Sequence, residues 1–180
     1  MILQQGRPKD CDERTARELA VYDLLDRLEI PYTRADHAPA ETMEVCAAID
    51  EVLNCRICKN LFLCNRQQTA FYLLMMPGDK PFKTKELSAQ IGSARLSFAS
   101  AEKMVEYLGL FPGSVSVMGL MNDNEHKVQL LVDQDLFRGE YIGCHPCVNT
   151  SSLKLRRTDI FETFLTAVKH NYLSVELNGE

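Results

Sequence analysis

The sequence lacks tryptophan, long apolar runs and internal repeats. Its 180 residues include no Trp and only nine Gly, and no apolar run approaches the roughly 20 residues that a membrane-spanning helix needs. The first ten residues, MILQQGRPKD, also lack the apolar core and small-residue cleavage site of a secretory signal. These absences exclude fibrous, disordered and membrane-spanning classes, and they predict one soluble domain over residues 1–180 in the cytoplasm.

The sequence also lacks the signatures of several large enzyme classes. It contains no G-x-S-x-G nucleophile elbow, P-loop, H-E-x-x-H pair or G-x-G-x-x-G turn. The net charge of −5 argues against nucleic acid as a partner, because phosphate groups are bound by Lys and Arg. Basic residues nevertheless gather within residues 80–85 and 154–157, either as solvated faces or as contacts for an anion. Net charge therefore does not decide the partner.

Seven cysteines are present, an odd number that is typical of free thiols in a reducing compartment. Cys55 and Cys58 form one C-x-x-C pair, and Cys144 and Cys147 form another, so a zinc-held structural protein is one alternative. The gap between the pairs far exceeds the roughly 15–20 residues of a compact zinc unit, and Cys58 falls inside an apolar run. We therefore predict no metal and no cofactor.

Apolar residues at helical spacing, together with helix-start signals, predict five helices. We expect them over residues 10–30, 42–53, 83–91, 100–108 and 158–168. Asp10 with Glu13 resembles a capping box, Thr42, Ser100 and Thr158 are the other expected N-caps, and Gly109 follows the fourth helix.

Apolar runs of strand length lie between these helices. They cover residues 32–37, 57–64, 69–75, 96–99, 115–121, 127–132 and 172–177. Strands come in succession instead of alternating strictly with helices. The pattern predicts an α/β fold of the α+β type, with a mixed, largely antiparallel sheet or open barrel covered by helices.

Two residues stand out as candidates for chemistry. Lys59 interrupts an apolar run, and an unpaired ammonium is costly to bury. It either protects an edge strand from aggregation or faces a cleft, where it would meet a phosphate or an acyl carbonyl. His145 precedes a proline, which favours an extended backbone, and the polar Asn149 and Thr150 follow. It is either a structural histidine or part of a polar pocket that handles protons near neutral pH.

Four short motifs connect these residues to a known family. They are KNLFL at 59–63, RLSFA at 95–99, LGxxPGSV at 108–115 and HPxxNT at 145–150. In this order they resemble YbaK-type editing domains, which are the prolyl-tRNA-synthetase-associated domains. The resemblance extends from about residue 14 to about residue 173 and is greatest to freestanding prolyl-tRNA deacylases.

The resemblance implies an aminoacyl-tRNA hydrolase, a carboxylic ester hydrolase that clears mischarged tRNA for proline, most often alanyl-tRNA. The CCA end of the tRNA would be the partner, with prolyl-tRNA synthetase as a second candidate and no membrane involved. It assigns Lys59 to the 3′ end of the tRNA, Gly113 to a loop whose N–H groups lie near the acyl carbonyl, and His145 to the same site.

Around these three residues, substrate-binding roles are expected for Asn60, Ser114, Val115, Asn149 and Thr150. One position departs from the family pattern, because Val117 stands where the G-x-x-x-P loop ends in proline. That departure bears on substrate choice, and it leaves a second hypothesis open. The domain would then bind tRNA or a synthetase without catalysis.

Overall fold

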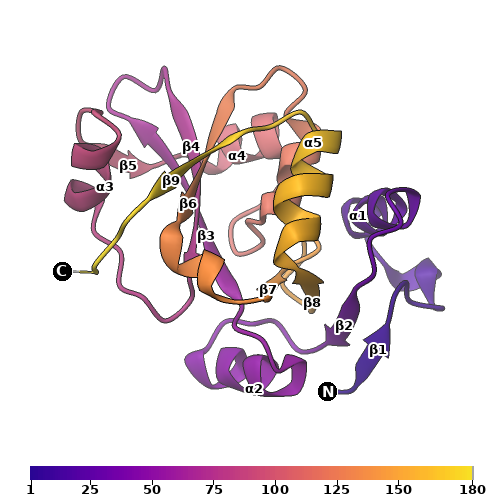
Figure 1. Ribbon diagram of the computed structural model, residues 1–180. Coiled ribbons are helices and arrows are strands. Elements are labelled where there is room, and N and C mark those ends of the chain that lie inside the picture. The colour runs from indigo at the N-terminus through magenta and orange to yellow at the C-terminus, as the bar shows by residue number, and fades with distance from the viewer. Residues whose placement is uncertain (180) are drawn as a thin grey trace.

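Two β-sheets and the helices around them form the fold (Figure 1). The computed structural model describes residues 1–179, except for the side chain of Met43. The strands are β1 (Leu3–Gln5), β2 (Thr33–Asp36), β3 (Cys58–Asn65), β4 (Phe71–Pro77), β5 (Leu96–Phe98), β6 (Val128–Asp133), β7 (Tyr141–Cys144), β8 (Ser151–Arg156) and β9 (Tyr172–Val175). The helices are α1 (Ala16–Arg27), α2 (Met43–Leu53), α3 (Thr84–Gln90), α4 (Ala101–Leu108) and α5 (Leu165–Ala167). No helix in this described part is both long and apolar enough to cross a membrane.

The larger sheet has the strand order β5-β3-β4-β6-β9, and the smaller sheet has the order β1-β2-β8-β7. Strand β6 pairs in parallel with β4 and β9, and the remaining pairings are antiparallel. Within residues 1–179 neither sheet closes into a barrel. The predicted mixed, largely antiparallel α/β fold is therefore confirmed, although its strands divide between two sheets.

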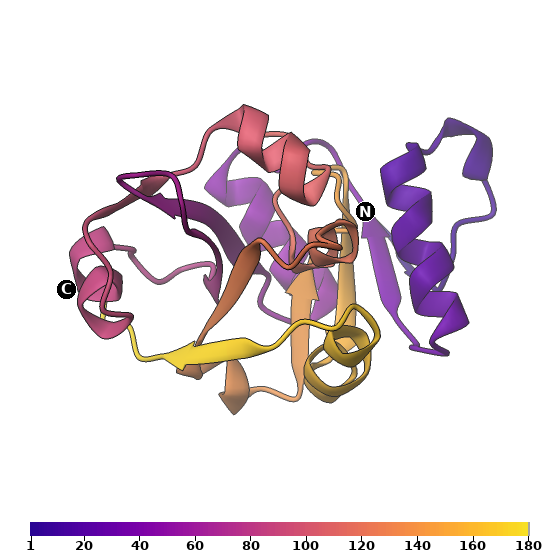
Figure 2. The ribbon, with the colours of Figure 1, turned by 90° about the horizontal axis from the view of Figure 1, so that it is seen from above.

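The main hydrophobic core lies on one face of the larger sheet, and a second core lies on the other. Successive residues of β4 point to opposite faces, so Leu73 and Met75 enter the main core while Leu74 and Met76 enter the core under α3. Helix α1 contributes Tyr22 and its apolar neighbours to the main core. Figure 2 shows α1 and α3 at opposite ends of the molecule.

Helix α2 lies at the base of the molecule in Figure 1 and leads directly into β3. The Thr42 hydroxyl caps it by accepting from the Val45 N–H at 3.3 Å, as predicted. Ile49 and Leu53 are buried against Ala35 of β2. With this face packed on the smaller sheet, other residues of α2 form a wall of a cavity near the start of β3.

Helix boundaries follow local capping. Ser100 caps α4, and Gly109 ends it in the left-handed conformation at φ +62°, as predicted. The cap of α1 is Thr15, whose hydroxyl accepts from the Glu18 N–H at 3.3 Å. The capping box predicted at Asp10 is wrong, because its side chain makes no capping hydrogen bond and residues 11–13 form a 3₁₀ turn.

The later part of the chain departs further from the prediction. Residues 117–122 form a 3₁₀ helix in place of a strand, because the Ser116 hydroxyl caps them by accepting from the Met118 N–H at 3.2 Å. Thr158 is itself helical and makes no capping bond, and a π-helical segment, Asp159–Phe164, leads into α5. Strands β7 and β8 were not predicted, since β7 has four residues and β8 contains only two apolar residues, Leu153 and Leu155.

The two sheets meet where the start of β3 passes β7. Ile57 and Gly143 form a parallel β-bridge, and the Gly143 N–H donates to the Arg56 carbonyl at 3.0 Å. A Cβ atom on Gly143 would lie 2.9 Å from the Ile57 Cα. Because backbone atoms cannot move aside as a side-chain end can, this approach requires glycine. The junction places the start of β3 beside the segment that carries His145.

We predict that Gly143→Ala destabilises the fold by about 1–3 kcal/mol, as overpacking does elsewhere. Gly139→Ala is the matched control, because its added Cβ would meet only the Tyr141 carbonyl oxygen at 3.3 Å. The measurement is the free energy of unfolding in urea for both variants. Equal stabilities of the two would show that the sheets do not depend on this approach.

Candidate active site

A cavity of about 410 Å³ opens beside this junction. Its volume lies within the roughly 300–1,000 Å³ typical of ligand sites. The lining residues come from α2 and the segment after it, β3, the turn after β4, the loop before the 3₁₀ helix and the segment after β7. They are Cys46, Ala47, Asp50, Arg56, Ile57, Cys58, Lys59, Asn60, Gly78, Asp79, Gly113, Val115 and His145.

Most of the predicted site residues meet in this cavity. Its lining includes Lys59, Asn60, Gly113, Val115 and His145. Lys59 and His145 therefore open on one hollow, which is the condition that the predicted site requires. The lining does not include Ser114, Asn149 or Thr150.

Lys59 lies where β3 is an edge strand, because β5 pairs with β3 only from Leu63 onward. Its Nζ donates to the Lys80 carbonyl. Among the ion pairs of residues 1–179, none involves this ammonium. Burial lowers the pKa of Lys59, and the nearby Asp79 carboxylate opposes that effect. An ammonium with N–H groups to spare and no bound carboxylate is suited to an anionic ligand.

His145 has a defined tautomer. Its Nδ1 lies 3.0 Å from the Ser151 carbonyl oxygen, which only accepts, so Nδ1 carries the proton and the neutral ring keeps a lone pair on Nε2. The Ser152 hydroxyl lies 3.2 Å from the same Nδ1 and 2.8 Å from Nε2 of His37. Burial lowers the pKa of His145, the Ser151 carbonyl opposes this, and His37 lowers the pKa further. The ring is therefore a neutral hydrogen-bond acceptor near pH 7.

The loop at residues 113–115 presents backbone donors. Gly113 has φ +85°, a left-handed conformation that favours glycine. The Ser114 N–H and hydroxyl both donate to the Phe111 carbonyl, at 3.1 and 2.8 Å, and close a turn. Within residues 1–179 the N–H groups of Gly113 and Val115 donate to no protein acceptor, and both residues line the cavity. Within this loop, those two N–H groups are the backbone donors that remain available to a ligand oxygen.

Ser116 ties this loop to the segment of His145. Its hydroxyl donates to the His145 carbonyl at 2.6 Å. Val117 is the first residue of the 3₁₀ helix, a position whose N–H has no partner within the helix. Proline and valine both suit such a position. The departure from the family pattern at Val117 is therefore compatible with the loop conformation.

Asn60 is a side chain of the cavity lining whose carbonyl oxygen lacks a hydrogen-bond donor. Its Nδ2 approaches the Cys58 Sγ at 3.5 Å. Its Oδ1 is buried and has no hydrogen-bond partner within the described residues. A buried acceptor of this kind is costly unless a ligand or water donates to it, so Asn60 offers a second contact point in the cavity.

Asn149 and Thr150 support the site through their backbones. The Asn149 carbonyl accepts from the Ala40 N–H and the Thr150 carbonyl accepts from the His37 N–H, each at 3.0 Å. These bonds hold the segment that enters α2. Thr150 lines a separate hollow beside the N-terminal turn, so the structure does not bring it to the cavity that contains Lys59.

Sequence reasoning missed the contribution of α2 and the segment that follows it. Asp50 faces the cavity, its Oδ1 accepts from the Ile57 N–H at 2.8 Å, and burial raises the pKa of its carboxyl. Arg56 and Asp79 form an ion pair at 3.3 Å on the rim. Helical spacing identifies the apolar face of α2 but not which polar residue turns inward, so the sequence contained no signal for Asp50.

The C-x-x-C cysteines lie near this cavity as free thiols. Cys58, Cys144 and Cys147 are buried, and Cys55 is half-buried. Burial raises the pKa values of Cys58 and Cys147 to about 12. Across residues 1–179 no group of three or more His, Cys, Asp or Glu side chains is placed to hold a metal ion. The zinc hypothesis finds no support in this geometry.

Comparison with known proteins assigns the family. A family model for the aminoacyl-tRNA editing domain matches residues 37–163, more than half of the chain. The chain belongs to this editing family. The prolyl-tRNA editing protein ProX of Acetoanaerobium sticklandii is 34% identical over 158 residues, which cover 88% of this chain and 96% of ProX. The prolyl-tRNA synthetase associated domain-containing protein 1 of Danio rerio is 29% identical over 82% of this chain and 80% of its own length.

Solved structures share the fold of this editing domain. A candidate trans-editing enzyme for prolyl-tRNA synthetase matches with a TM-score of 0.68 and 14% identity, covering 92% of this chain and 100% of the other. The hypothetical protein APE2540 matches with a TM-score of 0.65 and 19% identity, covering 86% and 96%. These likenesses show the fold alone. The family match confirms the resemblance inferred from the motifs and the aminoacyl-tRNA editing class of enzyme.

The lowered pKa of His145 predicts an acid-sensitive fold. The unfolded chain binds a proton at the ordinary pKa of 6.5, whereas the folded domain binds it only at lower pH. Stability is therefore lost as pH falls below about 6.5, by at most about 1.4 kcal/mol per pH unit. We expect His145→Gln to lose less stability than the wild type between pH 7.5 and 5.5 in urea unfolding. Identical losses in both proteins would contradict the assignment.

Proposed function

We propose that this editing domain is a trans-acting deacylase, and that it hydrolyses the ester of mischarged tRNA for proline, with alanyl-tRNA as its main substrate. The observation that carries the proposal is that Lys59, His145, Gly113 and Val115 line one cavity. The backbone N–H groups of Gly113 and Val115 have no protein acceptor within residues 1–179. The names of ProX and of the Danio rerio relative support proline tRNA as the substrate and prolyl-tRNA synthetase as a partner. The cytoplasm is the proposed place of action.

The proposed chemistry needs no covalent nucleophile. An aminoacyl ester is already activated, so orienting a water molecule and polarising the carbonyl supply much of the acceleration. The free N–H groups of Gly113 and Val115 would donate to the carbonyl oxygen as it becomes negative. Because the turn at Phe111 already holds the Ser114 N–H, Ser114 shapes the loop and does not contact the oxygen.

The remaining groups hold the terminal nucleotide. Lys59 would bind a phosphate oxygen at the 3′ end of the tRNA, since its ammonium has no carboxylate partner among the described residues. The Nε2 lone pair of His145 would accept from a ribose hydroxyl or from the attacking water. Asn60 Oδ1, which has no partner in residues 1–179, would accept from an N–H or O–H of the nucleotide.

Size would decide which acyl group is cleared. Ala47, Ile57 and Val115 line the cavity beside the free N–H groups. A methylene group distinguishes two substrates by only ~1–3 kcal/mol in a single binding step. A second, smaller site that admits alanine and excludes proline would therefore complement the discrimination made during charging.

We expect Lys59→Ala to lower kcat/KM for alanyl-tRNA roughly 10- to 100-fold, the value of a lost charge-assisted hydrogen bond. Release of alanine from tRNA for proline is the measurement. Lys127→Ala is the control, because Lys127 is exposed and pairs with Glu125 outside the cavity. Full activity in Lys59→Ala would contradict the site. Binding of tRNA by the wild type without release would favour the non-catalytic module.

A panel of charged tRNAs tests substrate choice. We expect the alanyl ester of tRNA for proline to be hydrolysed roughly 10- to 200-fold faster than the prolyl ester, within the range that small differences in size allow. The panel includes seryl and cysteinyl esters, with spontaneous hydrolysis of each subtracted. Preference for the prolyl ester would overturn the proposed sieve while leaving the deacylase activity in place.

A further inference from the structure

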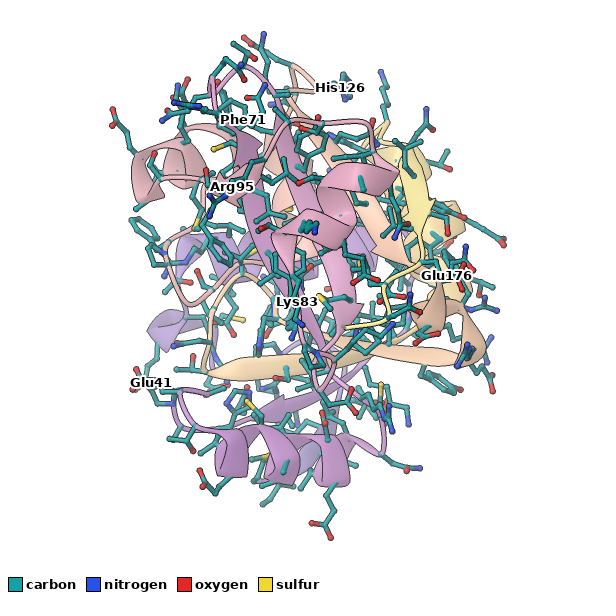
Figure 3. All side chains as sticks on the ribbon, turned by 90° about the vertical axis from the view of Figure 1, so that its left-hand side faces the viewer. Glu41, Phe71, Lys83, Arg95, His126 and Glu176 are labelled. Carbon is teal, nitrogen blue, oxygen red and sulfur yellow. The ribbon has the colours of Figure 1, made fainter. Side chains whose placement is uncertain are left out.

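A second hollow of about 520 Å³ adjoins the candidate active site. Its lining is formed by Lys59, Leu61, Phe82, Lys83, Thr84, Lys85 and Phe98, and we name it the Phe98 groove. Lys59 belongs to this lining and to that of the 410 Å³ cavity, so the two hollows meet at its side chain. Figure 3 looks onto this side of the molecule, with Lys83 labelled near the centre.

The aromatic residues of the groove are only partly explained by packing. Phe82 packs against the core under α3. Phe98, on the edge strand β5, belongs to no core cluster of the described residues and is 64% exposed. The two rings meet edge to face with centroids 6.4 Å apart. Phe82 thus contacts Phe98 on one side, and most of the Phe98 side chain remains exposed to solvent.

The charge of the groove is of one sign. Three lysines line it and no carboxylate does. Within residues 1–179 neither Lys83 nor Lys85 takes part in an ion pair. The chain as a whole carries a net charge of −5, so a lining with three lysines and no carboxylate is a local exception. The groove therefore combines uncompensated positive charge with an exposed aromatic ring.

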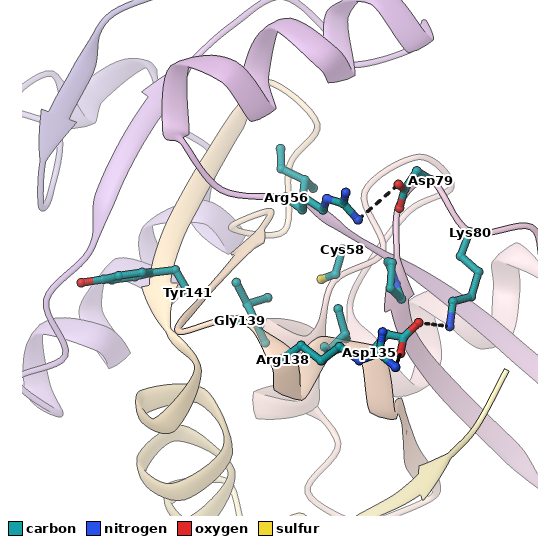
Figure 4. A pocket seen from close by; sticks show the side chains of 12 residues that line it. Arg56, Cys58, Asp79, Lys80, Asp135, Arg138, Gly139 and Tyr141 are labelled. Carbon is teal, nitrogen blue, oxygen red and sulfur yellow. Dashed lines mark ion pairs between the residues drawn. The ribbon is translucent and has the colours of Figure 1, made fainter. Parts of the chain in front are cut away.

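Another hollow also adjoins the active-site cavity, but its charges are already compensated. This cavity of about 550 Å³, shown in Figure 4, shares Arg56, Ile57, Cys58 and Asp79 with the candidate active site. Arg56 pairs with Asp79 at 3.3 Å, and Asp135 pairs with Lys80 at 2.7 Å and with Arg138 at 3.0 Å. Phosphate groups would have to compete with these carboxylates. The Phe98 groove imposes no such competition.

We propose that the Phe98 groove binds the single-stranded nucleotides that precede the terminal adenosine of the tRNA, with a base stacked on Phe98 and phosphates held by Lys83 and Lys85. This inference rests on the proposed function, because the terminal adenosine must lie in the cavity beside Lys59. Single-stranded nucleic acid is bound in this way elsewhere, by aromatic side chains under the bases and cations along the backbone.

Phe98→Ala tests the stacking part. Loss of one base–aromatic stack should raise KM for alanyl-tRNA about tenfold and leave kcat unchanged. The alanyl ester of adenosine 5′-phosphate has no upstream nucleotide, so its hydrolysis should be the same in variant and wild type. Phe98→Tyr should keep the wild-type KM. Leu173 is another exposed apolar residue, and Leu173→Ala is the control. It should leave KM and kcat unchanged for both substrates.

Two results would contradict the proposed role of the Phe98 groove without contradicting the proposed deacylase activity. One is an unchanged KM for alanyl-tRNA in Phe98→Ala. The other is an equal loss on both substrates, which would indicate damage to the active site itself. Failure of the wild type to hydrolyse either ester would instead overturn the proposed function.

The lysines are tested by the salt dependence of binding to a single-stranded RNA that ends in CCA and carries no amino acid. This measurement needs no catalysis, so it stands even if the deacylase proposal fails. Lys83→Ala should reduce the slope of log Kd against log salt by about 0.7, the value for one phosphate contact on a single strand. Arg138→Ala removes the same charge from the neighbouring cavity and should leave the slope unchanged. Equal slopes for the two variants would overturn the proposal.

Discussion

The close approach of Ile57 and Gly143 is the constraint on which the rest of the site depends. The two sheets contribute different functional groups, Lys59 and Asn60 from the larger and His145 from the segment that follows β7 of the smaller. Neither sheet alone encloses a cavity there. The β-bridge at this point, and the hydrogen bond from the Gly143 N–H to the Arg56 carbonyl, hold the two halves at a fixed separation. The packing between the two sheets thereby sets the positions of Lys59 and His145 relative to each other.

The proposed catalytic set is small, and this suits the proposed substrate. It combines one ammonium, one neutral imidazole and two backbone N–H groups, all fixed by contacts outside the cavity. Fixed dipoles stabilise a developing negative charge without reorganising during the reaction. The Ser116 hydroxyl contributes to that rigidity, because it links the loop of donors to the backbone of His145. An ester that is already activated requires little more.

The sequence predicted the parts of this arrangement that depend on local patterns. The caps at Thr42 and Ser100 follow from local capping signals, and β3 and β4 follow from apolar runs of strand length. The mixed fold class follows from the succession of strands along the chain. The pairing of β2 with β8 does not follow from local patterns, because it joins segments that are distant in the chain, such as Thr33 with Lys154. The cap at Thr15 was missed, since Asp10 and Glu13 gave a competing local signal.

For the candidate site, short motifs predicted which residues take part but not the hydrogen bonds that each of them makes. Ser114 matches a motif position, yet its N–H is held within a turn, and only the three-dimensional hydrogen bonding distinguishes it from Gly113 and Val115. Asp50 has no motif at all, because its position on α2 matters only after the helix packs against the smaller sheet. Every residue except proline carries a backbone N–H, so residue types alone do not show which loop supplies free donors.

The buried thiol of Cys58 has a consequence for the life of the enzyme. It lines the cavity that would hold the ester, and burial raises its pKa to about 12, which keeps the thiol protonated at neutral pH. The protonated thiol is a poor nucleophile, so it neither captures the acyl group as a thioester nor reacts readily with peroxide. Burial thus lets a cysteine form part of the wall without adding a reactive nucleophile to the cavity.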